Sequence, residues 1–228
     1  MRLDVMPLVA AGTMASTPQP EIASADAELF VRPWRLDDAP AFLAAFTDPA
    51  IQLWHRRDIV DLDEAETWIA TSGAEWGRET KANWAVVRPA DDIVLGRVSV
   101  SDLQLADGVA QVSYWVATEA RRQRVAPRAV DALSRWAFGD LGLSRLELRH
   151  STVNHASCRV AERSWFAAEG TAVRALLHAD WNQPTSTAGA PILGADDQQG
   201  SLQRTLSSGL PAVASSTVDD VLLGDLGS

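Results

Sequence analysis

The chain has 228 residues, of which 46% are hydrophobic and 22% are charged, as in a globular protein with one sizeable core. Its formal net charge of −10 disfavours nucleic acids and anionic membranes as partners, because an acidic surface repels phosphate groups. The only cysteine, Cys158, excludes an internal disulfide framework and a cysteine-based zinc site, and it fits a reducing cytoplasm. No apolar run approaches the roughly 18 residues of a transmembrane helix, so no membrane span is expected.

The two ends of the chain differ in composition from the middle. Residues 1–27 contain Thr-Pro-Gln-Pro and no aromatic residue, which predicts a flexible leader. Residues 182–228 contain no aromatic residue and one basic residue, Arg204, which predicts a disordered tail. A single globular domain is therefore expected over residues 28–181.

The hydrophobic pattern predicts an alternation of strands and helices within this domain. In chain order we expect a strand at 29–31, helices at 37–48 and 63–76, strands at 83–87, 94–100 and 110–116, a helix at 126–141, a strand at 145–150, a short helix from 154 and a strand at 171–177. The three consecutive strands predict an antiparallel meander, and the strand–helix–strand run after residue 110 predicts parallel pairing by a right-handed crossover. The fold class is therefore α/β.

The loop between Val116 and Ala126 connects a strand to the start of a helix, where free backbone N–H groups form an anion site. It carries a cluster of basic residues: Arg121, Arg122, Arg124 and, just inside the helix, Arg128. On an acidic chain this cluster favours a polyphosphate ligand. A solvated basic turn with weak surface ion pairs is equally compatible with these local features.

Residues 114–129 read Tyr-Trp-Val-Ala-Thr-Glu-Ala-Arg-Arg-Gln-Arg-Val-Ala-Pro-Arg-Ala. They resemble the acyl-CoA motif of GNAT acetyltransferases, Arg/Gln-x-x-Gly-x-Gly/Ala after a Tyr-Trp-Val-type strand. Residues 146–163 resemble the Asn-x-x-Ser segment of that family, and the stretches that begin at Val31 and Val94 also fit. The resemblance covers roughly residues 28–181 and is strongest to the ribosomal-protein N-terminal acetyltransferase-like branch. It implies a three-layer fold with a mixed, mostly antiparallel sheet and two splayed parallel strands around the coenzyme.

The resemblance also implies an activity, namely transfer of an acetyl group from acetyl-CoA to an amine by direct attack. The acceptor would be a protein N-terminus or a small-molecule amine, and no metal is implied. Roles carry over to these coenzyme-contacting positions: Val116, Arg121, Arg122, Gln123, Arg124, Val125, Ala126 and Asn154. Ser157 would protonate the departing thiolate, and Trp54, His55 and Gln111 would line the acceptor pocket. Helix capping by Asn154, a structural role for Ser157 and a surface position for His55 remain alternatives.

Four departures from the family pattern favour a second reading, a non-catalytic or repurposed acyl-CoA-binding protein. Arg124 replaces the motif glycine, which normally adopts a positive φ, so the loop could shift or the guanidinium could grip phosphate. Gln111 replaces a glutamate that many relatives carry, and an amide cannot relay a proton. Trp165 replaces a glycine, so the helix before it is expected to end differently. After Asp180 the family's last strand is not recognisable, and a homodimer or the tail could cover the exposed sheet edge.

Overall fold

The computed structural model of this chain describes residues 6–55, 58–169 and 173–178. The helices are α1 (Ala39–Ala45), α2 (Pro49–His55), α3 (Leu62–Gly77), α4 (Val125–Arg135) and α5 (His155–Arg163), with short helical turns at Leu36–Asp38, Thr118–Ala120 and Trp136–Asp140. The strands are β1 (Ile22–Ala23), β2 (Phe30–Pro33), β3 (Ala82–Val87), β4 (Val94–Gln104), β5 (Val109–Val116), β6 (Arg145–Arg149), β7 (Ala167–Ala168) and β8 (Val173–Leu177). The expected tail and the missing last strand lie outside the described residues.

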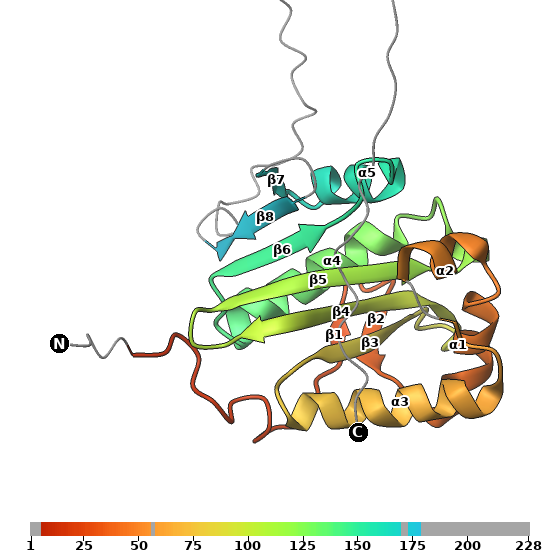
Figure 1. The fold of residues 1–228 in the computed structure, drawn as a ribbon, viewed down its shortest axis with the longest axis horizontal. Coiled ribbons are helices and arrows are strands. Elements are labelled where there is room, and N and C mark those ends of the chain that lie inside the picture. The colour runs from red at the N-terminus through yellow and green to blue at the C-terminus, as the bar shows by residue number, and fades with distance from the viewer. Residues whose placement is uncertain (1–5, 56–57, 170–172, 179–228) are drawn as a thin grey trace, which may run out of the picture. The chain divides into compact units, whose positions relative to one another are not determined.

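The strands form one mixed sheet in the order β1-β2-β3-β4-β5-β6-β8-β7 (Figure 1). Neighbouring strands are antiparallel except β5 and β6, which pair in parallel across the connection through α4. The expected meander, the parallel crossover and the α/β class are confirmed. None of the helices that the structure describes combines the length and the apolar character needed to cross a membrane.

Strand alternation divides the apolar residues between the two faces of the sheet. On one face, strand residues such as Val98, Val112 and Leu146 share a core with Val130 and Leu133 of α4. A separate core joins α1 and α3 to the sheet through residues that include Phe42, Trp68 and Trp115. Helices therefore cover both faces, which gives the expected three layers.

A short helix, α2, interrupts the region that the sequence predicts as a connection. α1 ends at Ala45, before the end at Asp48-Pro49 that the sequence predicts, and Pro49 instead begins α2, because the fixed φ of proline suits a first helical position. The Asp48 carboxylate accepts a hydrogen bond from the Ala50 N–H at 2.7 Å and so caps this helix. Trp54 and His55 therefore lie on a helix rather than in a loop.

The expectation of a flexible leader is wrong for its described part, residues 6–27. Val9 and Met14 are buried in the main core, and the Leu8 N–H donates to the carbonyl of Ala106 at 2.9 Å. The Glu79 carboxylate accepts hydrogen bonds from the N–H groups of Gly12, Met14 and Ala15, at 2.7, 2.7 and 3.2 Å. Burial opposes ionisation of this group, but the N–H donors together lower the pKa of Glu79. The segment is packed because these long-range contacts bury its apolar side chains and provide acceptors for its backbone N–H groups.

The end of α5 also differs from expectation. Trp165 occupies the glycine position and adopts the left-handed conformation itself, with φ of 65° and 77% of its surface exposed. The Phe166 N–H donates to the carbonyl of Ala161 at 3.0 Å, as in a Schellman motif, and the Phe166 side chain is buried. This helix end persists because burial of Phe166 offsets a local cost of about 1–2 kcal/mol at the tryptophan.

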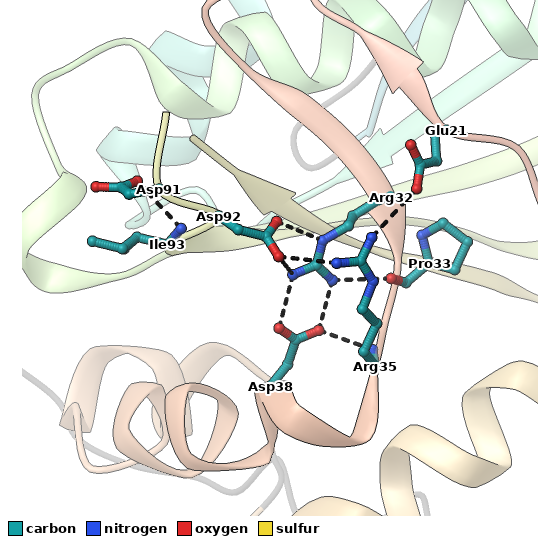
Figure 2. Close-up of polar contacts among 8 residues, drawn as sticks. All are labelled: Glu21, Arg32, Pro33, Arg35, Asp38, Asp91, Asp92 and Ile93. Carbon is teal, nitrogen blue, oxygen red and sulfur yellow. Dashed lines mark hydrogen bonds and ion pairs between the residues drawn. The ribbon is translucent and has the colours of Figure 1, made fainter. Parts of the chain in front are cut away.

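A buried ion-pair cluster fixes the start of α1 against the sheet. The Arg32 guanidinium on β2 forms two hydrogen bonds with the Asp38 carboxylate, at 2.7 and 2.9 Å (Figure 2). It also binds Asp92 in the turn between β3 and β4 at 2.9 Å, and Asp92 in turn binds Arg35 at 3.0 Å. The side chains of Arg32 and Asp38 are only 3% and 8% exposed. One arginine thus links a strand, a helix start and a distant turn.

Candidate functional site

The parallel strands β5 and β6 pair over only half of β5. Their register runs from Val109 opposite Arg145 to Val112 opposite Leu148, and residues 113–116 have no partner in the described part of β6. The Ala117 N–H donates to the carbonyl of Leu95 on the opposite side, at 2.9 Å. Because successive backbone groups point in opposite directions, the N–H and C=O of Val116 are turned toward the unpaired side. The carbonyl accepts a hydrogen bond from Arg121, so the group that the end of β5 offers at the splay between the two strands is the Val116 N–H.

The loop after β5 keeps the backbone shape that the family motif requires without its glycine. Arg122 and Arg124 have positive φ values of 65° and 59°, and Arg124 is the N-cap residue of α4. The Val125 and Ala126 side chains are buried, so only their backbone N–H groups can face a ligand. Pro127 has no N–H. The helix therefore presents two N–H donors in its first turn, at the positive end of its dipole.

The basic cluster splits into two paired and two unpaired arginines. Arg121 binds Asp48 at 2.5 Å, and Arg128 binds Asp26 and Glu28, both at 2.9 Å. Arg122 and Arg124 are exposed and form no ion pair with another residue within the described ranges. The positive charge available to an anion at this loop therefore comes from Arg122 and Arg124.

A cavity of about 570 Å³ adjoins this loop. Gln123 and Val125 line it together with Leu29, Leu95 and the paired Arg128. The Gln123 side chain is held by a 2.9 Å hydrogen bond to the carbonyl of Glu119. A second cavity, of about 420 Å³, lies along α3 and is lined by acidic residues, but by none of the predicted site residues.

Asn154 and Ser157 lie at the start of α5. The Asn154 side chain accepts a 3.1 Å hydrogen bond from the Ser157 N–H, so the capping role that the sequence left open is formed. Both side chains are half-buried. Ser157 lies beside the Tyr114 phenol of β5, and burial raises the pKa of that phenol to about 12 against a smaller opposing effect of Ser157. The Tyr114 hydroxyl has no fully formed hydrogen bond among the described residues.

The sheet face opposite α4 is polar where β4, β5 and β6 meet. Gln111 is half-buried there, and its register neighbour on β6 is Glu147. The Arg97 guanidinium donates hydrogen bonds to the hydroxyls of Ser99 and Ser113, at 3.1 and 2.9 Å, and lies over Trp68. A carboxylate is thus present beside Gln111, although hydrogen bonds from Arg149 and Arg145 hold it and lower the pKa of Glu147.

His55 reaches this region from the end of α2. Its ring is half-buried and hydrogen-bonded to the backbone of Tyr114. Burial and the charge of Arg97 lower the pKa of His55 to about 4, so the imidazole is neutral at pH 7. His55 is not the surface residue that the sequence allowed. Trp54 lies one residue earlier on α2 and is 40% exposed.

The structure thus brings two groups of predicted residues to β5. One group comprises Val116, the loop and the start of α5, and the other comprises His55 and Gln111. Sequence reasoning did not select Tyr114 or Asp48. Tyr114 stands two residues before Val116 within the quoted motif, so strand alternation places both on one face, which was a usable signal.

Comparison with known proteins agrees with this geometry. The family model described as Acetyltransferase (GNAT) domain matches residues 28–166. The uncharacterized N-acetyltransferase YoaA of Bacillus subtilis is 25% identical over 134 residues, which cover 58% of this chain and 76% of that protein.

Solved structures share the fold. A GCN5-related N-acetyltransferase from Brucella melitensis superposes with a TM-score of 0.62 at 22% identity, covering 72% of this chain and 81% of that one. Ribosomal-protein-S5-alanine acetyltransferase from Vibrio fischeri gives 0.60 at 18% identity, covering 68% and 96%. RimL, a ribosomal L7/L12 alpha-N-protein acetyltransferase solved with coenzyme A, gives 0.59 at 16% identity, covering 69% and 98%.

Proposed function

The chain belongs to the GNAT acetyltransferase family, and we propose that it transfers an acetyl group from acetyl-CoA to a primary amine by direct attack on the thioester. One observation carries the proposal: the Val116 N–H, turned toward the unpaired side of β5, lies next to the loop that leads into α4. The α4 donors would bind the diphosphate, and the Val116 N–H would polarise the acetyl carbonyl. We further propose a cytoplasmic location, in keeping with one free cysteine.

In the proposed reaction the amine nitrogen forms a bond to the carbonyl carbon, and the carbon–sulfur bond then breaks. The thiolate takes a proton from the hydroxyl pair formed by Ser157 and Tyr114, and solvent returns a proton to this pair before the next turnover. The proton that leaves the amine needs a base, and the Gln111 amide cannot supply one. The neutral His55 imidazole on the polar face has a free lone pair for this purpose. Positioning and backbone hydrogen bonding supply most of the rate enhancement.

The acceptor is proposed only as a class. A protein N-terminus and a small-molecule amine both fit a polar face that carries hydroxyls, an amide and the Glu147 carboxylate. The ribosomal-protein acetyltransferases among the structural neighbours are too distant to transfer their acceptors to this chain, because identities of 16–18% support the fold alone.

Binding and turnover test the proposal separately. Acetyl-CoA at millimolar concentration should raise the melting temperature, because it binds the folded state preferentially. Free thiol should then appear when the protein is mixed with acetyl-CoA and a panel of amines and N-terminal peptides. Binding without thiol release from any amine would favour the non-catalytic alternative, for which Gln111 in place of a carboxylate is the specific observation. No thermal shift would contradict both.

The unpaired Arg124 should matter more for coenzyme affinity than the paired Arg128. We expect Arg124→Gln to weaken acetyl-CoA binding by about tenfold and to reduce its salt dependence, because a charge-assisted phosphate contact contributes about 1.5–3 kcal/mol. Arg128→Gln is the matched control, since its guanidinium is already engaged by Asp26 and Glu28. Titration calorimetry at two salt concentrations measures both. Equal affinity of Arg124→Gln and the unmodified chain would show that the guanidinium points away from the phosphates.

A further inference from the structure

The Asp48 carboxylate joins two segments that the proposed reaction uses. One oxygen accepts hydrogen bonds from the Thr118 hydroxyl at 2.6 Å and from the Arg121 guanidinium at 2.5 Å. The other accepts the Ala50 N–H at 2.7 Å, in the first turn of α2. Thr118 and Arg121 both lie in the loop between β5 and α4. Figure 1 shows α2 beside the end of β5 from which this loop leaves.

Arg121 also reaches back to the strand. Its Nε donates to the carbonyl of Val116 at 3.4 Å, while its Nη2 binds Asp48. The guanidinium therefore bridges the end of β5 and the start of α2. The Asp48 side chain is 14% exposed and the Arg121 side chain is 40% exposed, so the carboxylate is the more sheltered partner of the pair. The hydrogen bond from Thr118, together with those from Ala50 and Arg121, lowers the pKa of Asp48 despite partial burial.

We infer that Asp48 is a positioning residue: through Thr118 and Arg121 it holds the loop in the shape that receives the coenzyme phosphates, and it ties that loop to α2, which carries Trp54 and His55. This inference rests on the proposed function. It assigns Arg121 a structural role: the guanidinium bridges β5 and α2 and neutralises a carboxylate near an anion site. The family resemblance implies a direct phosphate contact instead.

The two roles of Arg121 make opposite predictions for Asp48→Asn. The asparagine can still cap α2 and bind Thr118, but it loses the ion pair. If Arg121 serves as the structural bridge between β5 and α2, the loop becomes more mobile in this variant and acetyl-CoA binds more weakly. If Arg121 is a phosphate ligand, removal of its competitor leaves it free, and acetyl-CoA binds as well or better.

The test measures acetyl-CoA affinity by calorimetry for the full chain and for Asp48→Asn, Thr118→Val, Arg121→Ala and the Asp48→Asn/Arg121→Ala double variant. We expect Asp48→Asn and Thr118→Val to raise the Kd by about three- to tenfold, as for loss of one hydrogen bond near a charge. Arg121→Ala should bind acetyl-CoA more weakly than either of these variants, because it leaves the Asp48 carboxylate without its ion-pair partner. The double variant should bind at least as well as Arg121→Ala. Asp107→Asn, at an exposed turn, is the matched control.

A second readout needs no ligand. Amide hydrogen exchange should accelerate in residues 49–55 and in residues 117–124 together when Asp48→Asn is compared with the unmodified chain, because one carboxylate serves both segments. If the unmodified chain binds acetyl-CoA while Asp48→Asn binds equally well or exchange changes in one segment alone, the positioning role is wrong and the proposed function stands. If the unmodified chain does not bind but exchange rises in both segments, the link exists and the proposed function fails.

Discussion

Asp38→Ala should lower the free energy of unfolding by about 3–5 kcal/mol, which is the largest stability effect that we expect from one side chain outside the apolar cores. The substitution removes two hydrogen bonds to Arg32 and one to the Arg35 N–H, at 2.7, 2.9 and 2.8 Å. It leaves a guanidinium that is 3% exposed with Asp92 as its ionic partner. Urea unfolding at neutral pH, compared at fixed ionic strength, measures the change.

Forming a buried ion pair and losing one of its partners have unequal effects on the free energy of unfolding. A buried ion pair adds little to stability relative to apolar residues, but one buried charge without its partner is expensive. The ordinary pKa of an arginine guanidinium already lies far above neutral pH, so Arg32 stays charged after Asp38 is removed and cannot relieve the problem by deprotonation. The unfolded chain, where water solvates Arg32, is favoured instead.

Two controls separate this explanation from simple loss of contacts. Asp92→Ala removes a partner that is 51% exposed, and we expect a cost of about 1 kcal/mol or less there. Arg32→Met in the Asp38→Ala background removes the buried charge that has only Asp92 left as its ionic partner, and it should recover part of the lost stability. If the double variant is less stable than Asp38→Ala by the full cost of Arg32→Met alone, the two residues do not act as a pair.

Much of this architecture follows from local pattern. The alternation of Val112, Tyr114 and Val116 predicts β5, and Gly142, which has φ of 82°, marks the end of the helical stretch that begins with α4. The strand and the helix end depend on neighbours within one or two turns of chain, which sequence periodicity reports well. That Val116, the loop and Ser157 lie together is instead an expectation implied by the family resemblance, since these residues are far apart in the chain.

The features that sequence missed depend on partners far along the chain. The composition of residues 6–27 predicts a flexible leader. In the structure, Glu79 accepts hydrogen bonds from N–H groups of this segment and holds it in place. Arg124 and Trp165 occupy glycine positions and adopt positive φ values themselves, and their neighbours Val125 and Phe166 are buried and fix the turn. Asp48 could not be found from its local sequence, since its role arises from residues 118 and 121.

Ser157→Ala and Tyr114→Phe should each lower kcat by about 100-fold while leaving the acetyl-CoA Kd nearly unchanged, if this hydroxyl pair protonates the departing thiolate. The Tyr114 hydroxyl is a buried polar group without a fully formed hydrogen bond among the described residues, and Ser157 is its neighbour at the splay. A group that is costly to leave unpaired in the free chain gains a partner when a thiolate forms beside it, so its contribution is made in the transition state rather than in the ground state.

Folding provides an internal control for the same variants. Tyr114→Phe removes a hydroxyl without a fully formed hydrogen bond among the described residues, so its melting temperature should stay equal or rise, and lost activity cannot be attributed to unfolding. Because burial raises the pKa of Tyr114 to about 12, the phenol stays protonated through the assay range, and kcat should not fall from loss of this acid below pH 10.

If the two hydroxyls pass the same proton one after the other, the double variant should be no slower than the slower single variant. Unchanged kcat with a weakened Kd in Ser157→Ala would instead assign Ser157 to holding the pantetheine arm, and full activity of Tyr114→Phe would leave Ser157 as the acid without its neighbour.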